Sequence, residues 1–502
     1  MKYKKFDLLI IVIITIICLG YTYIAFENDI FYSIASGRDI LKYGVDMIDH
    51  YSIHSLAYSY PHWLFDLIAY FIYCFGGFKG LYFSAIIVYI AIGVLLYFLT
   101  INLYKNRFIS AVFTILAVIS LKDFITVRAQ SITYILFILE FFCIEKYLFT
   151  KQKKYLYFLI PISILILNMH CAVWPFFFIL FMPIIVEQII LLYKNKDIKI
   201  GKFEKKSGQF LISKANIKIN DEKLYIDEKY NLKFIFLIFF ICLLTGLITL
   251  NGFTPYTYLI KTMMGCSTNF INEHFPATLT FDTFLPVYLI VFSVLFFFVI
   301  KKIRLRDFFL VIGLFILAFS SYRHLSLLII LGTFIIVKVL SDEKSIKFCE
   351  SLIKYFSKNV IAVVMLFLFV CLSFSNYMKI YNEEFVNSKE YPVKAIGYIK
   401  ENLDYKNIRM YNSYNYGSYI LFNDVPVFID SRADLYTKEF NKLDREIFLD
   451  EMSIGENWDI ICKYYNLDYA LIKKNYPLNY VIQEKEYNIE YEDEYFILYK
   501  LK

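Results

Sequence analysis

The sequence predicts a mainly α-helical, polytopic membrane protein with a small external α/β domain at its C-terminus. Hydrophobic residues make up 59% of the 502 positions and charged residues only 19%. A soluble domain carries about 25% charge and is rarely more than half apolar. Apolar runs long enough to cross a hydrocarbon core of about 30 Å recur along the chain up to about residue 376. After that position, short strand-like runs replace them.

The N-terminus predicts a retained first span. The chain begins MKYKKFD and continues as an apolar run from Leu8 to Ala25. No small-residue cleavage site follows this run, so we interpret it as a membrane helix rather than a signal peptide. Its lysines place the N-terminus in the cytoplasm, because positive residues favour the cytoplasmic side.

The later basic segments predict the remaining topology of a multi-pass cell-membrane protein. They lie at 104–107, 150–154, 194–233, 301–306 and 342–358. If all of them are cytoplasmic, the spans between them pair off, which gives about eleven helices and an external C-terminus. The expected spans lie near residues 8–25, 81–101, 108–121, 131–149, 155–168, 173–193, 234–250, 284–300, 308–320, 325–340 and 359–376.

Residues 1–376 are thus the predicted transmembrane domain. Within it, residues 26–80 form an external loop, whose end HWLFDLIAYFIYCFGGF mixes aromatic and aliphatic residues and is typical of an interfacial helix. The lysine-rich stretch 194–233 is a cytoplasmic insertion, either a small hairpin or a disordered loop. Residues 377–502 combine strand-like runs (YILF, VPVFID, YALIKK, YFILYKL) with the helical pattern VKAIGYIKENL, which predicts the external α/β domain.

Cysteine usage and charge exclude several other classes. The nine cysteines have no CxxC spacing, which argues against a structural zinc site and a disulfide framework. The net charge of +7 arises from lysines in short loops, so no nucleic-acid partner is needed to explain it.

Six polar clusters beside the hydrophobic spans carry the functional prediction. Charged groups at the edge of hydrocarbon are costly and are therefore candidates for function. The predicted topology puts all six on the external side, where they would line one cavity. The clusters are Glu27/Asp29, Asp46/Asp49, Arg128/Gln130, Asn168/His170, Glu273/His274 and Arg323/His324.

The first external loop supplies the candidate carboxylates. Glu27 and Asp29 directly follow the first span, and a carboxylate in a partly dry site can act as a general base. The alternative is that Asp29 only caps the following helix. Asp46 and Asp49 are spaced three apart, which leaves open two oxygen ligands for a divalent cation, although a turn is the commoner role of such a pair.

Arg128 is the candidate phosphate ligand. Its planar guanidinium suits bidentate recognition of a phosphate, with Gln130 beside it. The alternative is that Arg128 extends to the membrane interface for solvation alone. Asn168 and His170 lie within one helical turn at the end of a span, where packing is the more common role of a single histidine.

Two further clusters lie in loops on the same predicted side. Glu273 and His274 follow the segment NGFTPY, and Arg323 and His324 separate two short apolar runs. Each cluster is a weak signal alone. Their common side favours a shared cavity.

Several stretches, in order along nearly the whole chain, also match a known pattern. They are DIFYSIASGRDILKYG, DHYS, HWLFDL, VRAQSITYILF, ILNMHCA, NGFTPY, NEHFP, YRHLSL, YPVKAIGYIKENL, NSYNYGSYILF and VFIDSRADLY. With this set the chain resembles the GT-C class of membrane glycosyltransferases, whose better-known members are protein O-mannosyltransferases and lipid A aminoarabinose transferases. It is most similar to a bacterial branch with an external C-terminal domain. Ser33, Asp46 and Ala129 stand where this branch more often has His, Pro and Pro.

The resemblance implies inverting transfer of a sugar from a polyprenyl-phosphate donor to an external cell-envelope acceptor, which is a glycan, a lipid or a protein. Asp29 would activate the acceptor hydroxyl, with Asp49 as the second catalytic candidate. Arg128, joined by His170 or Arg323, would hold the leaving phosphate, because fixed cations stabilise developing negative charge. The resemblance implies no organic cofactor, and a divalent cation stays open. The remaining candidate substrate-binding residues are Gln130, Asn168, His170, Glu273, His274 and Arg323.

Two other classes of function remain as alternatives. A transporter or flippase of a lipid-linked saccharide would use the same cations and cavity, but it needs access from both sides, and no inverted repeat is visible. A non-enzymatic envelope-assembly protein is the third. In the tail, Asp430, Arg432 and Asp434 within VFIDSRADLY are interpreted as a structural network.

Overall fold

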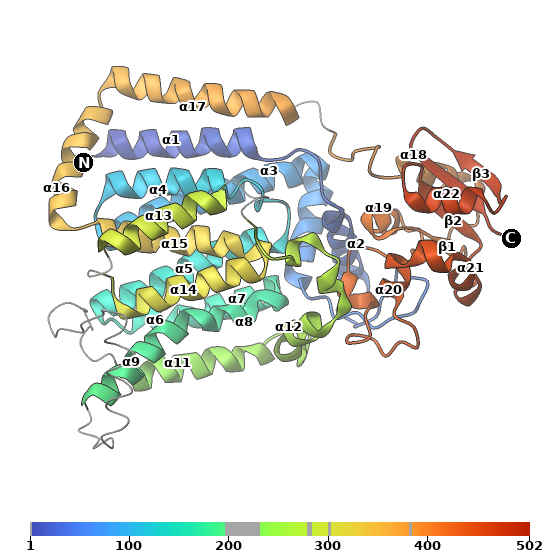
Figure 1. The fold of residues 1–502 in the computed structure, drawn as a ribbon, viewed down its shortest axis with the longest axis horizontal. Helices are drawn as coiled ribbons and strands as arrows, with labels where there is room; N and C mark the ends of the chain where they lie inside the picture. Colours follow the sequence, from blue (N-terminus) through green and yellow to red (C-terminus); the bar gives the residue numbers. More distant parts are fainter. Residues whose placement is uncertain (1–2, 196–230, 279–283, 300–302, 381–383) are drawn as a thin grey trace.

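The chain folds into a bundle of helices that adjoins a mixed α/β region. In this computed structural model the described residues are 3–195, 231–278, 284–299, 303–380 and 384–502. Figure 1 shows the start of the first helix and the C-terminal sheet at opposite ends of the molecule. Most of the predicted insertion 194–233 lies outside the described residues.

The bundle helices form where the apolar runs predict them. Helix α15 (Leu325–Leu340) matches its predicted span at both ends, and α1 (Lys4–Tyr21) begins a few residues before its own. The others are α4 (Arg107–Ser120), α5 (Ala129–Thr150), α6 (Lys154–Tyr157), α7 (Leu159–Met169), α8 (Trp174–Phe177), α9 (Met182–Asn195), α11 (Leu232–Leu244), α13 (Phe284–Val299), α14 (Leu305–Ser320) and α17 (Asn359–Ile380).

The helices have the composition of a membrane protein. Among the described residues, four are long and apolar enough to cross a membrane: 63–104, 171–190, 322–340 and 359–378. Several other apolar helices are shorter than that, so the number of about eleven spans remains a prediction. The chain is a mainly α-helical membrane protein.

Helix α3 (Trp63–Tyr104) includes the segment predicted as an interfacial helix. Gly77 interrupts it with φ 57° and ψ −153°, a conformation open to glycine, and divides α3 into two arms. The first arm crosses α2 (Asn28–Tyr43) so closely that a Cβ atom on Gly37 would lie 2.2 Å from the carbonyl oxygen of Asp66. This crossing fixes α2 against the end of the bundle.

An ionic network joins three helices at the end of the bundle where α1 begins. Glu145 on α5 pairs with Arg306 at 3.1 Å and with Lys338 at 2.9 Å. Asp307 on α14 pairs with the same Lys338 on α15 at 2.9 Å. All four side chains are at most 10% exposed. Because both signs are matched, the network satisfies charges that burial would otherwise penalise.

We expect a topology reporter fused after Lys154 to be cytoplasmic and one fused after Lys502 to be external. Lys154 begins α6, which lies at the same end of the bundle as the start of α1 (Figure 1), and the flanking lysines favour the cytoplasmic side. Alkaline phosphatase and green fluorescent protein fusions report the two sides. Equal signals at both positions would contradict the sidedness.

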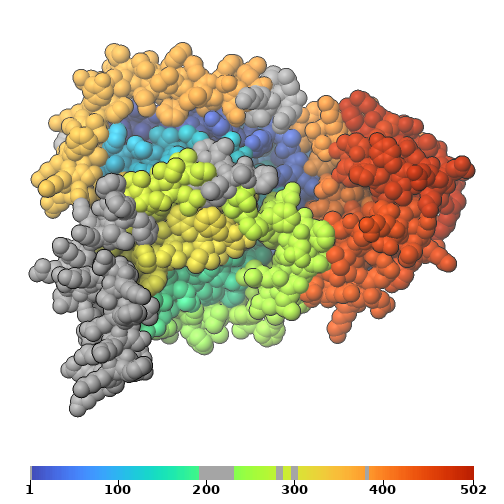
Figure 2. All heavy atoms as spheres, in the orientation of Figure 1, coloured from blue at the N-terminus to red at the C-terminus, as the bar shows by residue number. Residues whose placement is uncertain are grey.

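The first external segment and the tail fold together. One hydrophobic core contains Phe31 of α2 with Ile396 and Ile420 of the tail. Another joins Tyr60 of the first loop to Phe428. Figure 2 shows the tail, in red, packed against the residues near 250–280 in green. The tail is thus held both by the first loop and by the end of the bundle.

A four-stranded sheet lies in the tail. Its order is β1 (Met410–Tyr411), β2 (Tyr469–Lys473), β4 (Phe496–Lys500) and β3 (Asn488–Glu492), with β1 parallel to β2 and the other neighbours antiparallel. The tail helices are α18 (Val393–Asn402), α19 (Tyr414–Phe422), α20 (Ile447–Met452), α21 (Ile454–Tyr464) and α22 (Pro477–Gln483).

Two of the strand-like runs in the tail are not strands. YILF lies in helix α19, where Gly417 approaches so closely that an added Cβ would lie 1.9 Å from the carbonyl oxygen of Ile429. VPVFID is extended, but its backbone N–H groups bond outside the sheet. The N–H of Phe428 donates to the side-chain oxygen of Asn412 at 2.8 Å, and the N–H of Val427 donates to the carbonyl oxygen of Tyr51 at 3.0 Å. Packing against the first loop therefore replaces a strand at this position.

Candidate functional site

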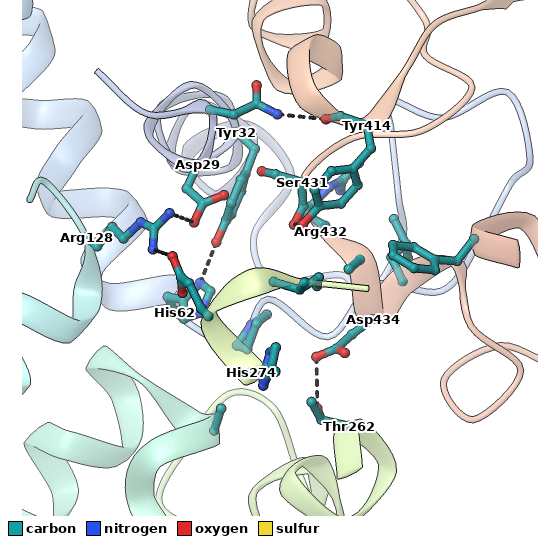
Figure 3. A pocket seen from close by; sticks show the side chains of 18 of the residues that line it. Asp29, Tyr32, His62, Arg128, Thr262, His274, Tyr414, Ser431, Arg432 and Asp434 are labelled. Atoms are coloured by element: carbon teal, nitrogen blue, oxygen red, sulfur yellow. Dashed lines mark hydrogen bonds and ion pairs between the residues drawn. The ribbon is translucent and has the colours of Figure 1, made fainter. Parts of the chain in front are cut away.

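A cavity of about 710 Å³ lies where the bundle end, the first loop and the tail meet. Figure 3 shows Asp29 and Arg128 on one side of it, and Tyr414, Arg432 and Asp434 on the other. The predicted site residues that line it are Asp29, Arg128, Gln130, His170, Glu273, His274 and Arg323. Segments far apart in the sequence thus contribute to one polar space.

Arg128 is the centre of a charge cluster beside this cavity. Its guanidinium pairs with Glu27 at 2.6 Å, with Asp29 at 3.1 Å and with Glu273. Burial tends to raise the pKa of Glu273, but Arg128 and Arg323 outweigh it and hold that pKa below its usual value. For Glu27, burial dominates and raises the pKa, helped by Asp29 and Glu273. The guanidinium of Arg128 therefore forms ion pairs with three carboxylates.

The helix starts explain how these groups meet. Helix α2 begins after Glu27, which holds the cap position without a capping hydrogen bond from its side chain, and Asp29 lies in the first turn. Arg128 holds the corresponding cap position of α5. A carboxylate near a helix N-terminus is favoured by the helix dipole. Asp29 is therefore not the capping residue, and its carboxylate faces Arg128.

Neutral histidines surround the cluster. Nδ1 of His62 lies 3.1 Å from the hydroxyl of Tyr32, and the rings of His62 and His170 meet edge to face at 4.9 Å. Burial, together with Arg323 and Arg128, lowers the pKa of His62 to about 3. These histidines are therefore uncharged at neutral pH and available for hydrogen bonding. Neither His62 nor Tyr32 was among the predicted site residues, although both lie in the matched stretches HWLFDL and DIFYSIASGRDILKYG.

Arg323 brings a second guanidinium to the cavity. Its Nη1 lies 3.3 Å from Nε2 of His274, whose pKa burial and Arg323 lower to about 4. Gln130 lines the same space, and its side-chain amide donates to the hydroxyl of Tyr134 at 2.6 Å. Arg128, Arg323 and several neutral donors therefore face one volume, which Arg432 of the tail also lines.

Asp49 lies outside the cavity, unlike the other catalytic candidate. It is fully buried and pairs with Arg432 at 2.8 Å, and its carboxylate accepts from the backbone N–H of Ser52 at 3.0 Å. Burial works against the charge of Asp49, but Arg432 outweighs it and lowers the pKa. These are the contacts of a structural carboxylate, which corrects the expectation that Asp49 joins Asp29 at the site.

Asn168 also lies outside the cavity lining. Its carbonyl accepts from the indole N–H of Trp63 at 2.9 Å, and its amide donates to the carbonyl oxygens of Ile164 at 2.8 Å and Ile248 at 3.1 Å. The side chain is thus committed to joining α7 to α3. It supports the wall that carries His170 instead of facing a ligand.

The tail contributes a wall that the sequence analysis did not assign to the site. Arg432 is held by Asp430 through Nε at 2.8 Å and Nη2 at 2.7 Å, which agrees with a structural network. Asp434, however, faces the cavity and accepts from Thr262 at 2.9 Å. The other tail residues of the wall are Ser413, Tyr414, Asn415, Ser431, Ala433, Leu435, Phe440, Phe448, Glu451 and Met452.

The described residues do not gather a metal site. Among them, no group of three or more His, Cys, Asp or Glu side chains has the arrangement to hold a metal ion. Asp46 and Asp49, the candidate cation ligands of the first loop, have different partners. Asp46 pairs with His50 at 2.8 Å, while Asp49 pairs with Arg432. Each aspartate also accepts from the backbone N–H two residues further on, Asp46 from Ile48 at 3.1 Å and Asp49 from Tyr51 at 3.3 Å.

Similarity to known proteins appears at the level of fold. No family model and no curated protein sequence matches the chain. Two crystal structures of ArnT from Cupriavidus metallidurans do match: one bound to undecaprenyl phosphate, with a TM-score of 0.50, and one in the apo state, with a TM-score of 0.51. Each is 11% identical in sequence, over 98% of this chain and 97% of that chain. The likeness extends over nearly the full length and supports a GT-C-like fold.

Proposed function

We propose that the protein is a membrane glycosyltransferase that moves a sugar from a polyprenyl-phosphate donor to an external cell-envelope acceptor. The observation that carries this proposal is the pair of guanidinium groups, Arg128 and Arg323, in one cavity with the carboxylate of Asp29. Phosphate is an anion that planar guanidinium groups bind well. The fold likeness to ArnT bound to undecaprenyl phosphate supports a lipid-linked donor.

The proposed reaction is a direct displacement. The acceptor hydroxyl attacks the anomeric carbon of the sugar, and the bond from this carbon to the phosphate oxygen breaks. Asp29 accepts the hydroxyl proton, and the polyprenyl phosphate leaves with the bonding electrons. Arg128 and Arg323 stabilise the charge that develops on the leaving phosphate. One displacement inverts the anomeric configuration.

A second cavity supports the lipid nature of the donor. It has a volume of about 380 Å³ and is lined mainly by apolar residues such as Ile30, Ala85, Ile125 and Val127. Arg128 lines both cavities. An isoprenoid chain in the smaller cavity would leave its phosphate at this arginine, with the sugar in the larger one.

Substitution of Arg128 tests this function. Both Arg128→Ala and Arg128→Lys should weaken binding of undecaprenyl phosphate, by about 10- to 100-fold, because a hydrogen bond to a charged group is worth about 1.5–3 kcal/mol. Lysine keeps the charge but loses the planar fork. Native mass spectrometry of the purified protein in nanodiscs measures the binding.

Arg107→Lys is the matched control, since Arg107 pairs with Asp7 far from the cavity and stays partly exposed. Its binding of undecaprenyl phosphate should equal that of the wild type. Normal binding by both Arg128 variants would contradict the phosphate role. If the proposed function holds, a deletion strain should accumulate the unused polyprenyl-phosphate sugar, which mass spectrometry of its lipids detects.

A further inference from the structure

The tail side of the cavity differs in chemistry from the side that carries Arg128. Its lining is rich in aromatic rings and in carboxyl groups. Phe440 packs edge to face on Tyr258 with ring centroids 4.9 Å apart, and Phe448 packs in the same way on Tyr414 at 5.8 Å. Aromatic faces offer a flat apolar platform with a polar edge.

Two carboxyl groups lie among these rings. Asp434 accepts from the hydroxyls of Thr262 at 2.9 Å and Ser267 at 3.5 Å, and burial raises its pKa. Glu451 accepts from the hydroxyl of Tyr411 at 2.7 Å, and burial raises its pKa to about 7. Groups of this kind both accept and, when protonated, donate hydrogen bonds. They suit a neutral, hydroxyl-rich ligand.

Two buried polar atoms beside the cavity have no hydrogen-bond partner among the described residues. Tyr58 is 5% exposed and lines the cavity, yet its hydroxyl has no hydrogen-bond partner among the described residues. Its ring lies 4.7 Å from the guanidinium of Arg432, which holds it in place. Nδ1 of His170, also 5% exposed, is likewise unpaired within the described part of the chain. Buried polar atoms in native proteins normally have partners.

We propose that this tail wall is a carbohydrate-binding subsite. It comprises Tyr414, Asp434, Phe440 and Glu451 of the tail, together with Tyr58 of the first loop and Tyr258 of the helix Thr254–Met264. The C–H face of a sugar ring packs on the aromatic side chains, while its hydroxyls bond to the carboxyl groups and to Tyr58. The inference rests on the proposed transferase function and adds to it that saccharide and phosphate are held on different walls.

Other ligand classes fit this wall less well. Carboxyl groups repel a phosphate, and an isoprenoid chain would place hydrocarbon against the carboxyl groups of Asp434 and Glu451 without bonding to them. A sugar satisfies both the rings and the polar atoms. The sugar is either that of the donor or part of the acceptor, since both meet at the reacting carbon.

The test compares two variants of the wall with the Arg128 variant. Phe440→Leu removes the ring but keeps an apolar side chain, and Asp434→Asn keeps the shape of the carboxyl group. The control is Asp424→Asn, because Asp424 is 56% exposed and pairs with Arg38 outside the cavity. The lipid probes are undecaprenyl phosphate, undecaprenyl-phosphate glucose and undecaprenyl-phosphate mannose. The soluble probes are an array of envelope oligosaccharides.

The wall variants should bind saccharide probes about 3- to 10-fold more weakly than the wild type and bind undecaprenyl phosphate normally. Arg128→Ala should bind soluble oligosaccharides as well as the wild type does and bind undecaprenyl phosphate more weakly. A preference for the sugar-loaded lipids assigns the subsite to the donor, and binding of soluble oligosaccharides assigns it to the acceptor.

Two outcomes would overturn the subsite. One is a wild-type protein that binds undecaprenyl phosphate but gains nothing from any sugar. The other is a pair of folded wall variants with unchanged saccharide binding. Either result leaves the phosphate role of Arg128 intact, whereas failure of the wild type to bind undecaprenyl phosphate would count against the transferase itself.

Discussion

Asp29→Asn is expected to lower sugar transfer by about 10²–10⁴-fold, the usual contribution of a general base. The amide preserves the size of the side chain but cannot accept the proton of the acceptor hydroxyl. Binding of undecaprenyl phosphate should not be weakened, because the substitution leaves both arginines in place and removes a carboxylate that pairs with Arg128 at 3.1 Å. Transfer is measured with purified protein added to membranes of a deletion strain, which supply the native donor and acceptor.

Asp46→Asn is the matched control for this experiment. Asp46 belongs to the same loop but pairs with His50 at 2.8 Å, away from the cavity. If Asp29 only stabilises the first turn of α2 through the helix dipole, its loss should cost about 0.3–1 kcal/mol of stability. Transfer per folded molecule would then be near that of the wild type. A stable Asp29→Asn protein with normal transfer would refute the catalytic assignment.

Arg432→Leu is expected to destabilise the protein by about 3–5 kcal/mol. Its guanidinium is 3% exposed and lies between Asp49 and Asp430, whose side chains are fully buried. Without Arg432, two buried carboxylates lose their only cation in this network, and an uncompensated buried charge is costly. Thermal unfolding of the detergent-solubilised protein measures the loss, which should appear first as protease sensitivity of the tail.

Arg38→Leu provides a control with the same connectivity. Arg38 and Asp424 also join the first loop to the tail, at 2.6 Å, but the two side chains are 32% and 56% exposed. An exposed pair of this kind contributes about 0–1 kcal/mol. Equal stability of the two variants would mean that Arg432 does not hold the loop and the tail together.

The helices of the bundle could be predicted well because their signal is local. A continuous apolar run marks α15 at both ends, and the predicted span 359–376 falls within α17. The tail was harder to predict. YILF has strand-like composition, yet it is helical because Gly417 allows α19 to lie against residue 429. Such a contact joins distant segments and leaves no local pattern.

The site could be predicted only where its residues carry a local signal. Arg128, Glu273 and Arg323 stand out as charges beside apolar runs, and their sidedness predicts that they meet. Tyr58 and Glu451 carry no such signal, because they reach the cavity only when the first loop and the tail share their cores. Asp49 stands out by the same criterion as Asp29, but in the folded protein its carboxylate forms an ion pair with Arg432.

The ionic network at the far end of the bundle has a consequence for the direction of access. Alternating-access transport requires the helices to separate at each end in turn. Separation of α5, α14 and α15 at this end would strip Glu145, Asp307 and Lys338 of partners that lie within 3 Å. Breaking buried ion pairs costs several kcal/mol. If this end stays closed, the cavity is reached from the opposite face alone, which we expect of a catalyst rather than of a carrier.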